Sequence, residues 1–234
     1  MPENPTRLVV AHPSESSEST SKGLLIFVVG LICVLVGCAC GFFAHRYLEN
    51  EKQYARYAAE LAPLIYYKDR VHGARERGSN ETMRLVNFKV YQAYQDGLDI
   101  VKLLELAQPR SKQPPNLAML NTRRFLSNLE LGIEYGIYEG EENLKALAYG
   151  KAPTITKGEY KGQRIDVEHV VPKAIAPDLD NILSNLMWLP ASLNQSKSDT
   201  ITDEAMEMAK IFRDEGILPL EQFLVVEKAY RDQA

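Results

Sequence analysis

A carboxylate and an imidazole stand next to each other at Glu168 and His169, in a segment that reads Asp-Val-Glu-His-Val-Val-Pro. A neutral imidazole is a suitable general base near pH 7, and carboxylate oxygens are ligands that hard cations such as Mg²⁺ prefer. Neighbouring side chains of a regular strand point to opposite faces, so this pair can share a site only where the strand ends or bends. Pro172 favours such an end, because proline cannot donate to a strand ladder. Taken alone, the pair is as typical of a surface ion pair as of a site.

A second group of polar residues follows from Asn185, in the sequence Asn-Leu-Met-Trp-Leu-Pro-Ala-Ser-Leu-Asn-Gln-Ser-Lys-Ser-Asp. The apolar residues after Asn185 predict a strand, and a large side chain such as Trp188 is expected in its core. If a helix begins near Ala191, Asn194 and Lys197 lie three residues apart on one face of its first turns. Lys197 is then placed to meet a phosphate.

Together these segments resemble the HNH signature of the ββα-metal (His-Me finger) nucleases, over about residues 164–203. They are similar to the endonuclease I family, in which Glu-His-Val-Val-Pro also occurs, and to the HNH domain of the CRISPR RNA-guided nucleases. The resemblance implies that His169 is the general base and that Asn185 orients its ring by hydrogen bonding. It also implies that Glu168 and Asn194 ligate the metal.

The chemistry that the resemblance implies is hydrolysis of a phosphodiester to a 5′-phosphate and a 3′-hydroxyl. This reaction needs an activated water and a cation on the phosphate oxygens. Mg²⁺ or another divalent cation is the expected cofactor, and nucleic acid is the expected partner, DNA more than RNA. Lys197, and Arg164 two residues before Asp166, are the candidates for contacts with substrate phosphate.

Cysteine usage and charge limit the kind of site. All three cysteines, Cys33, Cys38 and Cys40, lie in one apolar run, so the chain after residue 40 cannot form a zinc ribbon or a disulfide. The net charge is −4, and residues 151–234 hold 10 basic against 14 acidic residues. Binding to a polyanion is therefore expected to be modest and not sequence-specific, unless the middle of the chain contributes.

The N-terminal part predicts a membrane anchor. Residues 1–23 are typical of a disordered tail, and Leu24–Ala44 is an uncharged run. As a helix this run is long enough to cross a hydrocarbon core of about 30 Å, which predicts a single-pass membrane protein. A cleaved signal peptide and a lipoprotein signal ending at Cys38 are the alternatives. Basic residues flank both ends of the run, so the side of the membrane on which the rest of the chain lies stays open.

The remaining sequence divides near Gly150. From residue 46 to residue 150 apolar residues recur every three or four positions, which predicts an α-helical region. After Gly150 the residues favour turns and short strands, and 151–234 is the expected HNH-like domain. The strands and helices expected there are Arg164–Val171, Leu186–Leu189, Ala191–Glu215 and Pro219–Asp232. The predicted fold class is therefore α+β, with an N-terminal transmembrane helix, an α-helical middle region and, as the resemblance implies, a C-terminal ββα-metal module.

Two functions from different classes follow from this reading. The first is a membrane-anchored, metal-dependent endonuclease. The alternative is a membrane-tethered helical scaffold or binding protein with an inactive HNH-like module. An inactive relative has no chemical need to keep all four of Glu168, His169, Asn185 and Asn194, which favours the enzyme.

Overall fold

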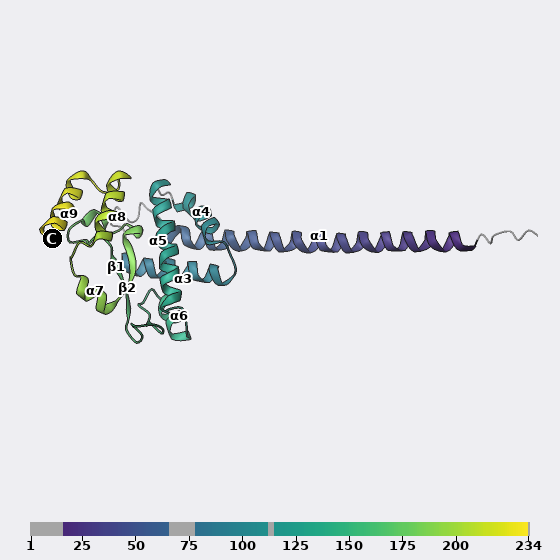
Figure 1. Ribbon diagram of the computed structural model, residues 1–234, viewed down its shortest axis with the longest axis horizontal. Coiled ribbons are helices and arrows are strands. Elements are labelled where there is room, and N and C mark those ends of the chain that lie inside the picture. Colours follow the sequence, from purple (N-terminus) through teal and green to yellow (C-terminus); the bar gives the residue numbers. More distant parts are fainter. Residues whose placement is uncertain (1–15, 66–77, 112–114, 234) are drawn as a thin grey trace, which may run out of the picture. The chain divides into compact units, whose positions relative to one another are not determined.

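A computed structural model describes residues 16–65, 78–111 and 115–233 of the chain (Figure 1). The side chains of residues 16–27, 29, 30, 32 and 33 are outside this description. The chain divides into two compact units, Met1–Glu51 and Lys52–Ala234, and each is described by itself. All the residues of the predicted site belong to the second unit.

Within the described ranges the chain forms eight α-helices and one sheet of two strands. The helices are α1 (Ser16–Leu64), α3 (Ser79–Gln95), α4 (Ile100–Ser111), α5 (Pro115–Glu134), α6 (Glu141–Ala148), α7 (Ala191–Lys197), α8 (Asp203–Asp214) and α9 (Leu220–Asp232). The strands are β1 (Ile165–His169) and β2 (Leu186–Pro190), and two short 3-10 helices, η1 (Pro177–Leu179) and η2 (Leu183–Asn185), lie between them.

The fold is mostly helical, so the predicted α+β class is wrong. The residues after Gly150 favour short strands, yet the described segment 151–164 contributes only one isolated bridge, between Thr154 and Arg164. The amide of Asn143, in α6, pairs instead with the backbone of Thr154. It accepts the Thr154 N–H at 2.9 Å and donates to the Thr154 carbonyl at 2.7 Å. A helix side chain thus satisfies backbone groups that a further strand would otherwise pair.

The predicted membrane span is also corrected. In the part of the chain that the structure describes, no helix has the length and apolar character needed to cross a membrane. By this finding the transmembrane helix predicted at Leu24–Ala44, and the single-pass localisation with it, are wrong. α1 continues through His45 and Arg46. Residues 1–15 of the predicted tail lie outside the described residues, whereas 16–23 are helical.

The two strands pair antiparallel over their full length, with Val167 opposite Trp188 and Glu168 opposite Met187. Directly opposed side chains lie on the same face of a sheet. One face, which includes Val167, Trp188 and His169, is buried, and the face of Glu168 and Met187 is half-buried. The register therefore places Glu168 and His169 on opposite faces, at the last two positions of β1.

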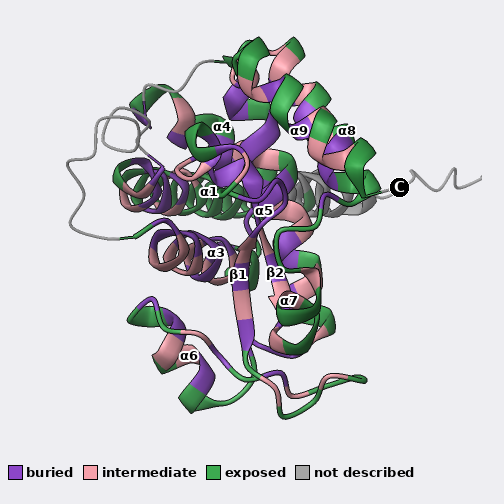
Figure 2. Ribbon diagram, turned by 90° about the vertical axis from the view of Figure 1, so that its left-hand side faces the viewer, coloured by how far each residue is buried: buried purple, intermediate pink, exposed green. Residues whose placement is uncertain are grey.

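The buried face of the sheet shares one hydrophobic core with α3 and α5. Figure 2 shows α3 beside β1, and α7 on the other side of the sheet next to β2. Asn128 of α5 bonds to the edge of β2, where its Nδ2 donates to the Leu186 carbonyl at 3.2 Å and its Oδ1 accepts the Trp188 N–H at 3.1 Å. Arg124, one turn earlier, donates through Nε to the Ser184 carbonyl at 3.1 Å. Helix α5 thus fixes β2 and the residues that lead into it.

The loop between the strands is packed into a second hydrophobic core, which α8 and α9 complete. Val171 and Leu179 of this loop are fully buried there, together with Phe212 of α8 and Phe223 of α9. Since each buried apolar side chain contributes about 1.5–3 kcal/mol, this packing holds the backbone that follows His169 in one conformation.

The helix predicted over Ala191–Glu215 is two helices, α7 and α8. The backbone turns at Ser198, whose φ of 46° is one that residues other than glycine rarely adopt. Thr202 then caps α8 and accepts the Ala205 N–H through its hydroxyl at 3.2 Å. As a result α7 is short, and Lys197 is its last residue.

Candidate active site

The half-buried face of β1 presents two carboxylates, Asp166 and Glu168. Their partners across the sheet are Leu189 and Met187. Helix α7 contacts both strands and carries Asn194, which bonds to Asp166. The order strand, strand, helix therefore gathers oxygen ligands between the sheet and α7.

The imidazole of His169 lies at the end of β1 and is 5% exposed. Its Nε2 is 3.2 Å from the backbone carbonyl oxygen of Asp180 and 3.2 Å from a carboxylate oxygen of the same residue. A carbonyl oxygen only accepts hydrogen bonds, so Nε2 carries the proton of the neutral ring and Nδ1 keeps the lone pair. Nδ1 is 3.9 Å from Oε1 of Glu168. The basic nitrogen of the ring is thus the one nearer the predicted metal ligand.

The side chain of Asn185 is fully buried and bonds to the backbone of the loop rather than to the ring of His169. Its Oδ1 accepts the Val171 N–H at 2.9 Å, and its Nδ2 donates to the carbonyls of Val171 at 3.0 Å and Leu179 at 3.4 Å. The Val170 N–H donates to the Asn185 carbonyl at 2.8 Å. Asn185 therefore acts on His169 through the backbone, by closing the loop directly after it, and the predicted bond to the ring is replaced by this clamp.

Asp166 connects the predicted metal ligand Asn194 to Arg164. Its carboxylate accepts from Nδ2 of Asn194 at 3.4 Å and from Nε of Arg164 at 2.9 Å. The bond from Asn194 uses the amide nitrogen, so it leaves the amide oxygen, the atom that ligates cations, for a metal. Arg164 is exposed, and part of its guanidinium faces Asp166.

The amine of Lys197 donates to the backbone carbonyl of His169, which ties the end of α7 to the end of β1. Burial lowers the pKa of Lys197, and the nearby carboxylate of Glu168 opposes that change. The predicted contact of Lys197 with a substrate phosphate therefore competes with a bond inside the protein.

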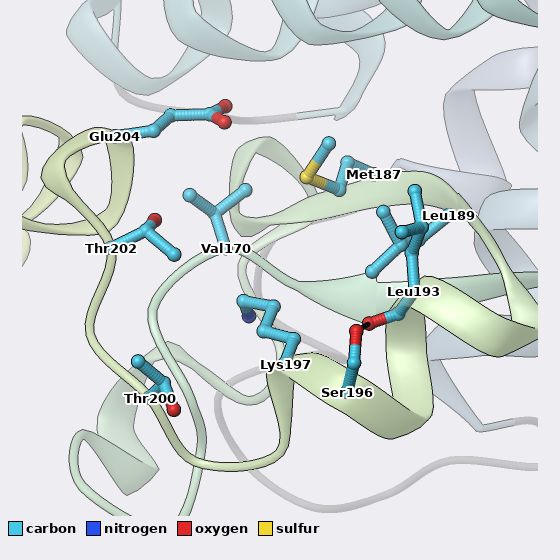
Figure 3. Close-up of a pocket in the computed structure, with 9 residues that line it drawn as sticks. All are labelled: Val170, Met187, Leu189, Leu193, Ser196, Lys197, Thr200, Thr202 and Glu204. Carbon is cyan, nitrogen blue, oxygen red and sulfur yellow. Dashed lines mark hydrogen bonds between the residues drawn. The ribbon is translucent and has the colours of Figure 1, made fainter.

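A cavity of about 330 Å³ opens between α7, β2 and the segment that leads into α8 (Figure 3). Val170, Met187 and Leu193 form an apolar wall, Lys197 lies in the middle, and Glu204 stands at the far rim. Met187 is the partner of Glu168 across the sheet, so the cavity lies on the carboxylate face. Of the predicted site residues only Lys197 lines this cavity, and Glu168 borders it through its strand partner Met187.

The donor set suits a hard cation held by few protein ligands. Among the described residues no group of three or more His, Cys, Asp or Glu side chains could hold a metal by itself. Glu168 and Asn194 offer two oxygen ligands on one face, and Mg²⁺ commonly takes one or two such ligands and completes its shell with waters and phosphate. The chemistry of these residues therefore fits a Mg²⁺ ion that binds together with a phosphate substrate.

The sequence did not single out Asp180, whose carbonyl and carboxylate oxygens both lie 3.2 Å from Nε2 of His169. Asp178 stands two positions earlier in the same Pro-Asp-Leu-Asp-Asn stretch and is exposed. The two residues have the same chemistry, and only the fold shows which one reaches the ring of His169. No signal in a single sequence separates them.

Comparison of the chain with protein-family models, with curated proteins and with solved structures finds no match.

Proposed function

We propose that the chain is a metal-dependent endonuclease that hydrolyses phosphodiester bonds of nucleic acid, with His169 as the general base. The observation that carries the proposal is the orientation of the imidazole. The carbonyl of Asp180 accepts a hydrogen bond from Nε2–H, so the lone pair is on Nδ1, the nitrogen 3.9 Å from Glu168. The HNH-like residues of the sequence support the same assignment.

In the proposed reaction His169 takes a proton through Nδ1 from a water held on the Glu168 side of the ring. The carbonyl of Asp180 keeps the ring in the required tautomer, and the Asp180 carboxylate, 3.2 Å from Nε2, stabilises the imidazolium that forms. The water attacks the phosphorus, the bond to the 3′ oxygen breaks, and that oxygen takes a proton from solvent, which leaves a 5′-phosphate and a 3′-hydroxyl.

Glu168 and the amide oxygen of Asn194 would hold the divalent cation. When it is bound, such a cation stabilises the negative charge on the phosphate and leaving oxygens. Asp166 acts one step further out, because it bonds to the amide of Asn194 and so orients that ligand. We expect DNA to be cleaved in preference to RNA.

The test is digestion of plasmid DNA and of RNA by the full chain, with EDTA and with a series of divalent cations. His169→Ala should lower the cleavage rate by about 10²- to 10⁴-fold, the usual contribution of a general base. The variant should still unfold cooperatively, because the change removes only one side chain, at the end of β1. Activity that survives EDTA, or cleavage by His169→Ala at the wild-type rate, would overturn the proposal.

A matched pair of variants tests the role of the loop. Asp180→Asn keeps the carbonyl bond to Nε2 but removes the carboxylate charge beside it, whereas Asp178→Asn changes the same chemistry at an exposed position. Asp180→Asn should cleave more slowly than wild type, and Asp178→Asn should not. Equal rates for the two variants would remove Asp180 from the mechanism.

A further inference from the structure

A second cavity, of about 510 Å³, borders the candidate active site on the other side of Asp166. It lies between α3, the turn that follows α6 and the residues that lead into β1. Its charged lining residues are Glu81, Arg84, Lys151, Arg164 and Asp166. Three cations against two carboxylates give a net charge of +1 here, although the chain as a whole has a net charge of −4.

Arg84 lines this cavity and is held in place by the turn that follows α6. Its Nη1 donates to the backbone carbonyl of Gly150 at 3.3 Å, while its buried Nε has no hydrogen-bond partner among the described residues. Burial lowers the pKa of Arg84, opposed by the nearby carboxylate of Asp166. Burying part of a guanidinium charge is costly, and the negative charge of an anion in the cavity would offset part of that cost.

Asp166, one of the two carboxylates of the cavity, is already engaged. Asp166 accepts from Arg164 and from Asn194. Glu81 packs against Gly150, where a Cβ would lie 2.4 Å from Glu81 Cγ and where φ is +67°. A glycine is therefore required at position 150 for the turn to pass this close to α3, and the cavity wall depends on it.

The cavity continues the carboxylate face of β1. Asp166 lines it, and Glu168, the predicted metal ligand, is two residues further along the same face, roughly 7 Å away. An anion in the cavity would thus lie next to an anion at the metal site, on the Asp166 side along β1.

We propose that this cavity binds a backbone phosphate of the nucleic-acid substrate next to the one that is cleaved, with Arg84, Lys151 and Arg164 as its ligands. Guanidinium groups match the geometry of phosphate oxygens and favour it over simple anions. The proposal rests on the proposed nuclease function. It adds a binding subsite in which Arg84 and Lys151 have no part in the chemical step.

The test measures binding separately from cleavage. A fluorescently labelled DNA duplex is titrated with the His169→Ala chain in Mg²⁺, and anisotropy is followed between about 50 and 200 mM salt, the range over which phosphate contacts dominate affinity. Lys151→Glu, at an exposed position, is added to that background. Lys210→Glu, an exposed residue of α8, is the matched control, because it makes the same change in net charge away from the cavity.

Lys151→Glu should weaken binding and lower the slope of log K against log salt by about one, the value for one lost phosphate contact. Lys210→Glu should leave the slope unchanged. Arg164→Gln should act in the same direction as Lys151→Glu, and in the cleaving enzyme both should raise KM more than they lower kcat.

The outcomes separate the two proposals. If the wild-type chain cleaves DNA while Lys151→Glu and Arg164→Gln bind like Lys210→Glu, the subsite is wrong and the nuclease assignment stands. If the wild-type chain neither binds nor cleaves nucleic acid, both are wrong. A loss of affinity without a change in salt slope also overturns the subsite, because a phosphate contact must release counterions.

Discussion

The two strands of the sheet are equal in length and fully paired, yet they differ in what they carry. β1 alternates buried apolar residues with Asp166 and Glu168 and ends on His169. β2 has apolar side chains throughout, from Leu186 to Leu189. The reactive groups are therefore on one strand, and the other supplies a rigid edge and a hydrophobic surface.

The strands also differ in how they are held. β2 is fixed from α5, where Asn128 bonds to the backbone on either side of Met187. The end of β1 is fixed from the loop, where Asn185 bonds to Val171. We therefore expect stability and activity to separate: changes around β2 should act on folding, and changes at the end of β1 should act on the proposed cleavage.

The largest expected effect on stability is that of Trp188→Ala. Trp188 lies in the middle of β2, is 1% exposed and is the only tryptophan of the chain. Its removal should lower the free energy of unfolding by about 3–5 kcal/mol, as for other buried aromatic residues. Denaturant unfolding followed by circular dichroism measures this change.

Met187→Ala is the control on the same strand, because Met187 is only half-buried on the opposite face. It should destabilise the protein clearly less than Trp188→Ala does. An equal loss in the two variants would mean that the faces of β2 are not as different as their burial indicates.

Asn185→Ala and Asn128→Ala form a matched pair that tests whether the two strands are held independently. Both asparagines are fully buried and bond to backbone groups, so each change should cost about 1–3 kcal/mol from the partners left unsatisfied. The activity of the folded protein should differ. Asn185→Ala frees the loop that follows His169 and should slow cleavage, whereas Asn128→Ala should cleave at close to the wild-type rate.

Trp188 fluorescence reports the fraction folded in both asparagine variants, so that rates are compared per folded molecule. Should Asn128→Ala lose as much activity as Asn185→Ala, the two anchors would not be independent, and the division between the strands would fail.

The sequence predicted the parts of the site that depend on local pattern. The strand at Leu186 and the helix that begins at Ala191 follow from apolar spacing. The structure has the strand within one residue of its predicted bounds and begins the helix at the predicted residue, although α7 ends at Lys197. Position along a strand also predicts that Asp166 and Glu168 share a face. These features follow from the spacing of apolar residues and from the alternation of side chains along a strand.

What the sequence could not predict depends on contacts between distant residues. The bond from Asp180 to His169 and the clamp from Asn185 to Val171 exist only once the loop is packed against α8 and α9. The amide of Asn143 bonds to the backbone of Thr154, and apolar spacing in the sequence cannot predict such a bond. It is the reason that a strand-like composition did not give a larger sheet.

The smallest expected effect concerns Lys197, whose amine bonds to the carbonyl at the end of β1. Burial places the pKa of Lys197 in the folded protein below its ordinary value of 10.5. Below the folded pKa both states are protonated, and burying the charge costs stability. Above it the folded state loses the proton first, so this cost falls as pH rises toward 10.5.

Lys197→Met should remove this gain in stability at alkaline pH, whereas Lys210→Met, at an exposed position, should keep it. The measurement is the difference in unfolding free energy between pH 7.5 and pH 9.5 for the three proteins. The same difference in wild type and Lys197→Met would show that the amine is not buried against β1.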